Sequence, residues 1–319
     1  TINSKTPHSE HFSITAASEI MAILCLATDY NDLEKRLSNI LIAYSKEGQP
    51  LFAKDLKITG SLVVLLKDAL KPNLVQTLEH NPVFLHGGPF ANIAHGCSSI
   101  IATKTALKVS DYCITEAGFG SDLGGLKFYD IKSRLTKKRP DAVVLVTTIK
   151  ALKYNGQDNL EAGFANLKAH LDILSKFTKN IIVCLNKFDT DTETEIALLK
   201  EYVTSHHLPF CLSTAYKDGS KGTLDLAMQV TKLTDDTPYQ ELYDVNLSLQ
   251  DKIALIVKKF YHANAVNYTT SALSVIAELE KNHLANKPIC IAKTQYSISD
   301  NKNLLGYPKD YSVTVRDLK

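Results

Sequence analysis

The residues with the clearest chemical character form a glycine-rich stretch at positions 115–125, with the sequence TEAGFGSDLGG. It combines four glycines with Phe119 and two acids, Glu116 and Asp122. Because glycine has no Cβ, such a stretch can turn tightly and bring backbone N–H groups close to a ligand. It follows a short apolar run at 112–114 that we predict to be a strand, and loops after strands bind ligands in α/β proteins. The acids could orient an amino group or a metal, but for a lone acid a helix cap or a solvated side chain is the commoner outcome.

A second glycine-rich stretch, HGGPFAN at positions 86–92, follows another apolar run at 83–85. Backbone N–H groups near a helix start favour a phosphate or carboxylate ligand. His86 and His95 have the chemistry of a general acid or base, although a histidine in a core or a cap is the commoner outcome. The sequence contains no Gly-x-Ser-x-Gly elbow, so covalent catalysis has no support.

A third candidate is the sequence NKFD at positions 186–189, which matches the Asn-Lys-x-Asp pattern by which GTPases hold guanine. The later CLSTA at 211–215 is similar to the GTPase loop behind the guanine base. GTPases also need a Gly-x-x-x-x-Gly-Lys-Ser/Thr loop to cradle phosphates, and no Gly-Lys pair occurs here. We interpret this stretch as a base-binding loop at most.

These candidate loops share a position, because each follows an apolar run. Six such runs occur, at 83–85, 112–114, 142–146, 181–185, 209–212 and 288–292. Strands that are apolar throughout and separated by helical patterns predict an α/β fold, with a parallel sheet and helices on both faces. The loops after such strands emerge at one edge of the sheet, so we expect one composite site there.

Helices without obvious chemistry are expected in the first part of the chain. Residues 18–27 form an apolar block that suits a buried helix, and residues 60–70 form a second that stops before Pro72. Between them, Asn31 and Glu34 have the spacing of a capping box, with Asn31 as the N-cap. Two apolar stripes at helical spacing then follow, one through Leu33, Leu37, Ile40 and Leu41 and one through Ile93, Cys97, Ile100, Ile101 and Ala106. A later helix is expected from about Glu193.

Length and composition limit the number of domains and the classes of partner that the chain can have. The chain has 319 residues, enough for roughly two domains, and 45% of them are apolar. The formal net charge is only +2, which gives no bulk electrostatic argument for a nucleic-acid or membrane-surface partner. None of the six cysteines forms a C-x-x-C pair, a pattern typical of reduced thiols in a cytosolic protein. The histidines show no metal-ligand spacing, and no apolar run approaches the length of a membrane span.

Four motifs together resemble a known family. They are ASEIMAI at 17–23, HGGPFANIAHG at 86–96, TEAGFG at 115–120 and AKTQYS at 292–297. In this order they resemble formate–tetrahydrofolate ligase, also called formyltetrahydrofolate synthetase. The resemblance extends from near Phe12 to Asp317.

The resemblance implies ATP-dependent ligation of formate to tetrahydrofolate, giving 10-formyltetrahydrofolate, ADP and phosphate through formyl phosphate. The implied cofactors and substrates are ATP with Mg²⁺, formate, tetrahydrofolate and a monovalent cation. It further implies a cytoplasmic homotetramer that serves one-carbon metabolism and purine biosynthesis, with no nucleic-acid or membrane partner. Phosphoryl transfer depends mostly on positioning and charge stabilisation, and a mixed anhydride must be kept from water, which suits glycine-rich loops.

Matching motifs carry the family's binding residues onto this chain, but they assign no catalytic residue and no metal ligand. Those implied for folate and formyl phosphate are Gly118, Phe119, Gly120, Phe188 and Tyr216. Those implied for the nucleotide are Gly88, Phe90, Asn92, Asn186, Leu212, Ser213 and Gly219. Members of the family often have Trp where Tyr216 stands and Pro where Asp189 stands, so stacking on the pterin is expected to differ here.

The resemblance also implies an arrangement of domains. We expect part of a P-loop NTPase-like large domain over 1–179, a second α/β domain over 180–236 and a third over 237–319. The family's phosphate-binding loop with its Lys, and an Arg and a Glu near the formyl group, do not occur in these residues. Neither does the Gly/Ala-rich segment that follows in the family. We therefore expect little or no ligase activity from these residues alone. An inactive or regulatory nucleotide- or folate-binding module and a GTP-binding protein are the alternatives.

Overall fold

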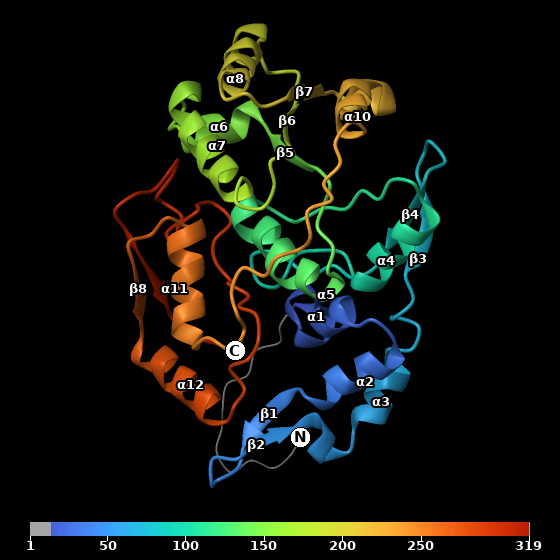
Figure 1. The fold of residues 1–319 in the computed structure, drawn as a ribbon, viewed down its shortest axis with the longest axis vertical. Helices are drawn as coiled ribbons and strands as arrows, with labels where there is room; N and C mark the ends of the chain where they lie inside the picture. The colour runs from blue at the N-terminus through green and yellow to red at the C-terminus, as the bar shows by residue number, and fades with distance from the viewer. Residues whose placement is uncertain (1–13, 319) are drawn as a thin grey trace. The chain divides into compact units, whose positions relative to one another are not determined.

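The computed structural model describes residues 14–318. The chain divides into two compact units, unit 1 (Thr1–Glu116) and unit 2 (Ala117–Lys319), drawn from blue to red in Figure 1. Phe12, near which the family resemblance begins, lies outside the described residues, as do the start of the predicted domain over 1–179 and the last residue of the predicted domain over 237–319. The three-domain division stays a prediction.

Unit 1 combines short helices with two antiparallel hairpins, β1–β2 and β3–β4. Its elements are η1 (Thr15–Ala17), α1 (Glu19–Leu26), α2 (Tyr30–Ser38), β1 (Leu41–Tyr44), β2 (Pro50–Phe52), η2 (Ala53–Leu56), α3 (Thr59–Leu65), β3 (Asn73–Gln76), β4 (Pro82–Leu85) and α4 (Ile100–Val109). The core of this unit is a small cluster, Leu24, Ala27, Leu33, Leu37 and Leu70.

Helix α1 confirms the apolar block at 18–27, and its N-cap is Ser18, whose hydroxyl accepts a bond from the Met21 N–H. The predicted N-cap of α2 was wrong. Asp29 caps this helix by accepting from the Asp32 N–H at 2.9 Å, and Asn31 lies inside it. The Asp32 carboxylate in turn accepts from the Thr28 N–H at 3.0 Å, so an Asp–Asp pair takes the place of the expected Asn–Glu pair.

Other expectations for unit 1 were also corrected. Helix α2 ends at Ser38, so Ile40 lies beyond it and Leu41 opens β1. Helix α3 spans Thr59–Leu65, so it begins one residue before the predicted 60–70 and ends five residues earlier. The run 83–85 belongs to β4 of an antiparallel hairpin and not to a buried parallel sheet. The predicted helix through Ile93 starts only at Ile100, because the Ser99 hydroxyl caps α4 by accepting from the Ala102 N–H.

Unit 2 contains the predicted parallel sheet. Strands β5 (Val143–Thr147), β6 (Ile181–Asn186) and β7 (Phe210–Ser213) pair in that order, all parallel (Figure 1). Helix α8 (Glu193–Ser205) starts where the sequence predicted, on a capping box of Thr192 and Glu195. The predicted runs at 142–146, 181–185 and 209–212 are therefore confirmed as strands, each with an end shifted by a residue or so.

Alternation along β6 explains why both faces of this sheet are covered. Ile181, Val183 and Leu185 pack with α6 (Ile149–Asn155), α7 (Leu160–Leu174) and α8. The alternate residues Ile182 and Cys184 pack with Cys211 and with side chains of α10 (Leu224–Val230) and the residues after it. Successive side chains of a strand point to opposite faces, so these two clusters lie on opposite sides. Helices on both faces of a parallel sheet confirm the α/β class.

The rest of unit 2 surrounds a larger core. The helical turns η3 (Ser121–Gly125), η4 (Phe128–Lys132) and α5 (Ser133–Thr136) run almost without a break, and α9 (Ala215–Asp218) and η5 (Gly219–Thr223) follow β7. Further on come α11 (Leu249–Phe260), β8 (Ala265–Tyr268), α12 (Thr270–Lys281) and β9 (Ser312–Val315), with β8 and β9 paired in parallel. In the core, Phe177 stacks between Tyr129 and Phe260, with ring centroids 4.1 and 5.2 Å away.

Two predicted strands do not form. Residues 112–114 are irregular, and the side chain of Ile114 is 93% exposed. Residues 288–292 are also irregular, although Ile289 and Ile291 pack against the core. In both places apolar side chains occur without a neighbouring strand to satisfy the backbone, so the apolar run alone misled the prediction. No helix within residues 14–318 is both long enough and apolar enough to cross a membrane.

Candidate functional site

The loop around Phe119 presents an aromatic side chain on an unusual backbone. Phe119 has φ +61°, in the left-handed region that non-glycine residues seldom adopt, and its side chain is 60% exposed. Backbone bonds close the loop beneath it. Gly124 N–H donates to the Gly118 carbonyl at 3.0 Å, and Leu123 N–H donates to the Gly120 carbonyl at 3.1 Å. A strained residue held by its surroundings is a common feature of binding sites.

At two positions of this loop, only glycine fits, because neighbouring atoms leave no room for a Cβ. A Cβ on Gly124 would lie 2.3 Å from the Gly118 carbonyl oxygen, and a Cβ on Gly120 would lie 2.4 Å from the Asp122 Oδ1 atom. Both distances are shorter than real contacts, so neither position accepts a larger residue without a shift. The glycines thus serve close packing within the loop, in addition to any ligand they approach.

Asp122, which sequence reasoning left without a role, is the centre of a buried ionic cluster. Lys293 Nζ lies 2.5 Å from Asp122 Oδ2, and the two side chains are only 3% and 5% exposed. The same ammonium group donates to the carbonyls of Ser297 and Thr294 at 2.5 and 3.1 Å. A buried charge needs such a full set of partners. The signal was present in the sequence, because Lys293 belongs to the AKTQYS motif, but nothing in the sequence showed its partner.

His170 of α7 completes this cluster. Its Nδ1 atom lies 2.8 Å from the Ser121 hydroxyl and 3.9 Å from Asp122 Oδ1. Burial lowers the pKa of His170 below its usual value, Asp122 opposes that shift and Lys293 adds to it. Tyr261 lies in contact as well, since its hydroxyl donates to the Asp122 carbonyl at 3.2 Å, and burial raises the pKa of Tyr261 well above the ordinary value.

A second group of predicted residues lies at the carboxyl edge of the sheet. Asn186 ends β6 and pairs in register with Ser213, which ends β7. Phe188 follows Asn186, is half exposed, and has its N–H bonded to the Asp191 carboxylate at 2.8 Å. The Lys187 N–H donates to the Ser213 carbonyl at 3.0 Å and links the two loops. The structure thus brings the loops after β6 and β7 together at one edge, as predicted.

The loop after β7 carries the remaining members of this group. Leu212 is partly buried in the strand, and the Tyr216 side chain is fully exposed. Gly219 has φ +59°, which favours glycine there, and the Gly222 carbonyl accepts from the Thr214 N–H at 3.1 Å. The Lys187 ammonium group of the NKFD sequence donates to Glu193 at 2.8 Å.

In unit 1, Gly88 has open space around it, Phe90 is partly exposed and Asn92 is half-buried. His86 is buried, with its ring nitrogens 2.6 Å from the Ser99 hydroxyl and 2.7 Å from the Ala69 carbonyl. Both ring nitrogens are therefore engaged, and the interpretation of His86 as a core histidine is confirmed. A single composite edge that unites this loop with those of unit 2 stays a prediction.

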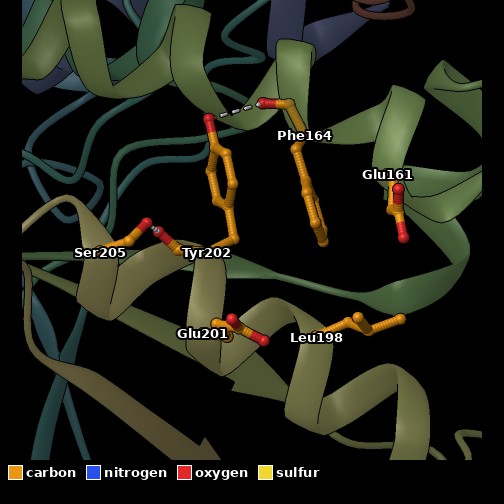
Figure 2. A pocket seen from close by; sticks show the side chains of 6 residues that line it. All are labelled: Glu161, Phe164, Leu198, Glu201, Tyr202 and Ser205. Atoms are coloured by element: carbon orange, nitrogen blue, oxygen red, sulfur yellow. Dashed lines mark hydrogen bonds between the residues drawn. The ribbon is translucent and has the colours of Figure 1, made fainter.

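A pocket in unit 2 does not coincide with these groups. A shallow pocket of about 290 Å³ lies between α7 and α8 (Figure 2). It is lined by Glu161, Phe164, Leu198, Glu201, Tyr202 and Ser205. Phe164 and Tyr202 stack with centroids 4.4 Å apart, so the pocket is a groove where two helices pack. It contains none of the predicted site residues.

Metal ligands are not grouped in the described part of the chain. Among residues 14–318, no set of three or more His, Cys, Asp or Glu side chains is arranged to hold a metal ion.

Comparison with known proteins agrees with the motifs. The sequence model of the formate–tetrahydrofolate ligase family matches residues 2–319. A protein of Petrotoga mobilis (strain DSM 10674 / SJ95), named formate–tetrahydrofolate ligase, is 50% identical over 325 residues. That match covers 98% of this chain but only 59% of the relative, so the chain spans somewhat more than half the relative's length. On this evidence the chain belongs to the formate–tetrahydrofolate ligase family.

Proposed function

We propose that the enzyme containing this chain ligates formate to tetrahydrofolate at the expense of ATP. The observation that carries the proposal is the family match over residues 2–319. In this reaction a formate oxygen attacks the γ-phosphorus of ATP, which releases ADP and leaves formyl phosphate. The folate N10 then attacks the formyl carbon, phosphate leaves, and N10 loses its proton to give 10-formyltetrahydrofolate.

Phe119 is the proposed platform for the pterin. An exposed aromatic ring on a constrained backbone offers a flat apolar surface at little cost in side-chain entropy, which supports this role. Gly118 and Gly120 flank it and would allow the formyl phosphate to approach the backbone. Phe188 and Tyr216 are the proposed further aromatic contacts, and both are exposed on loops that follow strands of the sheet.

The nucleotide is assigned to two sets of residues. Asn186, Leu212, Ser213 and Gly219 occur at the carboxyl edge of the sheet, where α/β proteins commonly bind nucleotides. Gly88, Phe90 and Asn92 of unit 1 are proposed as further nucleotide-binding residues. These residues would bind and orient ATP, and Mg²⁺ on its phosphates would neutralise the charge that develops during transfer.

Finer features of the family complete the proposal. They are a P-loop NTPase-like large domain over 1–179 with smaller domains over 180–236 and 237–319, a monovalent cation, a homotetramer and a cytoplasmic location. The parallel sheet with helices on both faces supports a nucleotide-binding fold of this general kind.

Substitution of Phe119 tests the pterin platform. In the full-length enzyme, Phe119→Ala is expected to raise the KM for tetrahydrofolate about tenfold, equivalent to about 1.4 kcal/mol, because stacking area is lost. The KM for ATP should change less than about twofold. Tyr154→Ala is the matched control, since Tyr154 is also an exposed aromatic residue of unit 2 but lies on α6. Equal effects on both substrates would contradict the platform.

Calorimetry with ATP, GTP and tetrahydrofolate separates the alternatives. Binding of ATP and tetrahydrofolate together with formate-dependent ADP release supports the ligase. Binding without turnover by the full-length protein would favour an inactive or regulatory module. A preference for GTP, which only the NKFD sequence suggests, would overturn both.

A further inference from the structure

The loop that carries the exposed ring of Phe119 contains a buried charge, the Asp122 carboxylate, three residues further along the chain. We propose that the ion pair of Asp122 and Lys293 is a positioning device that holds the Phe119 loop in the shape that receives folate. His170 and Ser121 support this pair. The inference rests on the proposed function, because it takes the pterin as the occupant of the Phe119 surface.

The Asp122 carboxylate is fixed in both position and direction. Lys293 Nζ has three oxygen partners, namely Asp122 Oδ2, the Ser297 carbonyl and the Thr294 carbonyl, at 2.5, 2.5 and 3.1 Å. The ammonium group of lysine has three hydrogens, so this set satisfies it. Because the pair is buried, movement of either group would leave an uncompensated charge, which is strongly unfavourable.

The fixed carboxylate in turn fixes the backbone next to Phe119. Asp122 Oδ1 occupies the space that a Cβ on Gly120 would enter, at 2.4 Å. The Gly120 carbonyl accepts from the Leu123 and Gly125 N–H groups at 3.1 and 3.3 Å. Phe119, at φ +61°, is thus followed at once by a residue whose carbonyl is hydrogen-bonded and whose α-carbon has no room for a side chain beside the Asp122 carboxylate.

Two neighbours outside the loop hold it from other elements. The Ser121 hydroxyl bonds to His170 of α7, at 2.8 Å from Nδ1 and 3.3 Å from the carbonyl oxygen. Tyr261, which follows α11, donates to the Asp122 carbonyl. The loop is therefore held by three other parts of unit 2, namely the segment with Lys293, α7 with His170, and Tyr261.

Burial excludes a direct catalytic role for this pair. The side chains of Lys293 and Asp122 are 3% and 5% exposed, whereas Phe119 is 60% exposed. A substrate on the Phe119 surface would contact the aromatic ring and the backbone, and the ion pair would act through them. Asp122 and Lys293 are positioning residues, and a loss of either should alter folate binding more than ATP binding.

The test compares two buried lysines in the full-length enzyme. Lys293→Met is expected to raise the KM for tetrahydrofolate about tenfold, with less than a twofold change in the KM for ATP. Lys252→Met is the matched control. Lys252 is fully buried in the same unit, but its ammonium group bonds to the carbonyls of Val245, Ala285 and Lys287. It should destabilise the protein without changing the ratio of the two KM values. Equal ratios in both variants would overturn the inference.

A readout without substrate separates this inference from the proposed function. Relative to other amides of unit 2, hydrogen exchange at the amides of Leu123, Gly124 and Gly125 should become at least tenfold faster in Lys293→Met but not in Lys252→Met. If exchange changes in this way but Phe119→Ala leaves folate binding intact, the pterin platform fails and the anchor stands. If Phe119→Ala weakens folate binding while Lys293→Met changes neither exchange nor KM, the anchor alone fails.

If Lys293→Met does not fold, glycine variants provide a second test of whether the Asp122 carboxylate controls the loop. Gly120→Ala places a methyl group 2.4 Å from Asp122 Oδ1, whereas Gly125→Ala places one 3.5 Å from the Ser121 Cβ, an ordinary contact. Exchange at the Leu123 amide should rise in Gly120→Ala and not in Gly125→Ala. The same exchange rate in both variants would show that the Asp122 carboxylate does not control the loop.

Discussion

Asp122 illustrates what sequence reasoning misses at the scale of single residues. A lone acid in a glycine-rich stretch suggests a cap or a solvated side chain, and its partners Lys293 and His170 are far away in the sequence. Only the fold shows that these groups meet. His86 is the opposite case, because the commoner outcome for a histidine, a buried and fully bonded ring, was both expected and found. Phe119 and Tyr216 were predicted as binding residues through motifs; both side chains are exposed, and their roles stay predictions.

Burial of His170 leads to a prediction about how the free energy of unfolding depends on pH. Because burial lowers its pKa in the folded state, the unfolded chain binds more protons below the ordinary histidine pKa of about 6.5. The stability that neutral His170 contributes is therefore fully present above about pH 6.5 and is lost as the pH falls through the lower folded pKa. The variant His170→Gln should lose less free energy of unfolding than the wild type between pH 7 and pH 5, as measured by urea denaturation.

The control for this experiment is His207→Asn, which replaces an exposed histidine at φ +58° with a residue that tolerates that backbone. It should retain the wild-type pH dependence. Burial also lowers the pKa of His262, so His170→Gln should keep part of the acid-side loss. A pH dependence in His170→Gln identical to that of the wild type would mean that His170 is protonated as readily in the folded as in the unfolded chain.

At the scale of elements, the sequence predicted best where strands are buried on both faces. Strands β5, β6 and β7 were found because an apolar run without alternation is typical of the middle of a parallel sheet. The runs at 112–114 and 288–292 have the same composition but no partner strand, and composition cannot show pairing. Strands β8 and β9 were missed because each has only four residues and carries polar side chains.

Close packing of α6 against α7 leads us to expect that a Gly-to-Ala change in α7 destabilises the protein, although Ala has the higher helix propensity. Ala normally stabilises a helix by about 1 kcal/mol relative to Gly. A Cβ on Gly163 of α7, however, would lie 2.0 Å from the Leu152 carbonyl oxygen of α6. Gly163→Ala should therefore lower the free energy of unfolding by about 2 kcal/mol, because overpacking forces the helices apart. Gly60→Ala in α3, where nothing lies within 4 Å, is the control and should be neutral or slightly stabilising. Guanidinium denaturation of both variants measures the difference, and a stabilised Gly163→Ala would contradict the close helix contact.

At the scale of the whole molecule, the two units differ in the size of their buried apolar clusters. Unit 2 contains three clusters of buried apolar residues and the central sheet. Among its described residues, 14–116, unit 1 has one small cluster of five buried residues, and it exposes large apolar side chains at Val64, Leu65, Leu74 and Leu78. Such a core provides little hydrophobic free energy to offset the loss of chain entropy. The sequence predicted roughly two domains, but it did not show this imbalance, which depends on which apolar residues become buried.

Unit 2 is therefore expected to fold by itself. A fragment of residues 117–319 should show near-ultraviolet circular dichroism from ordered tyrosines, since Tyr129, Tyr243 and Tyr261 are buried in its core, and it should unfold in one cooperative thermal transition. A fragment of residues 1–116 should give a broad transition with weak tertiary signal, because its small core leaves too little apolar burial for cooperative unfolding. If the larger fragment instead bound a hydrophobic dye and lacked the tyrosine signal, its clusters would depend on the rest of the chain, and the Asp122–Lys293 anchor would have to be studied only in the full-length enzyme.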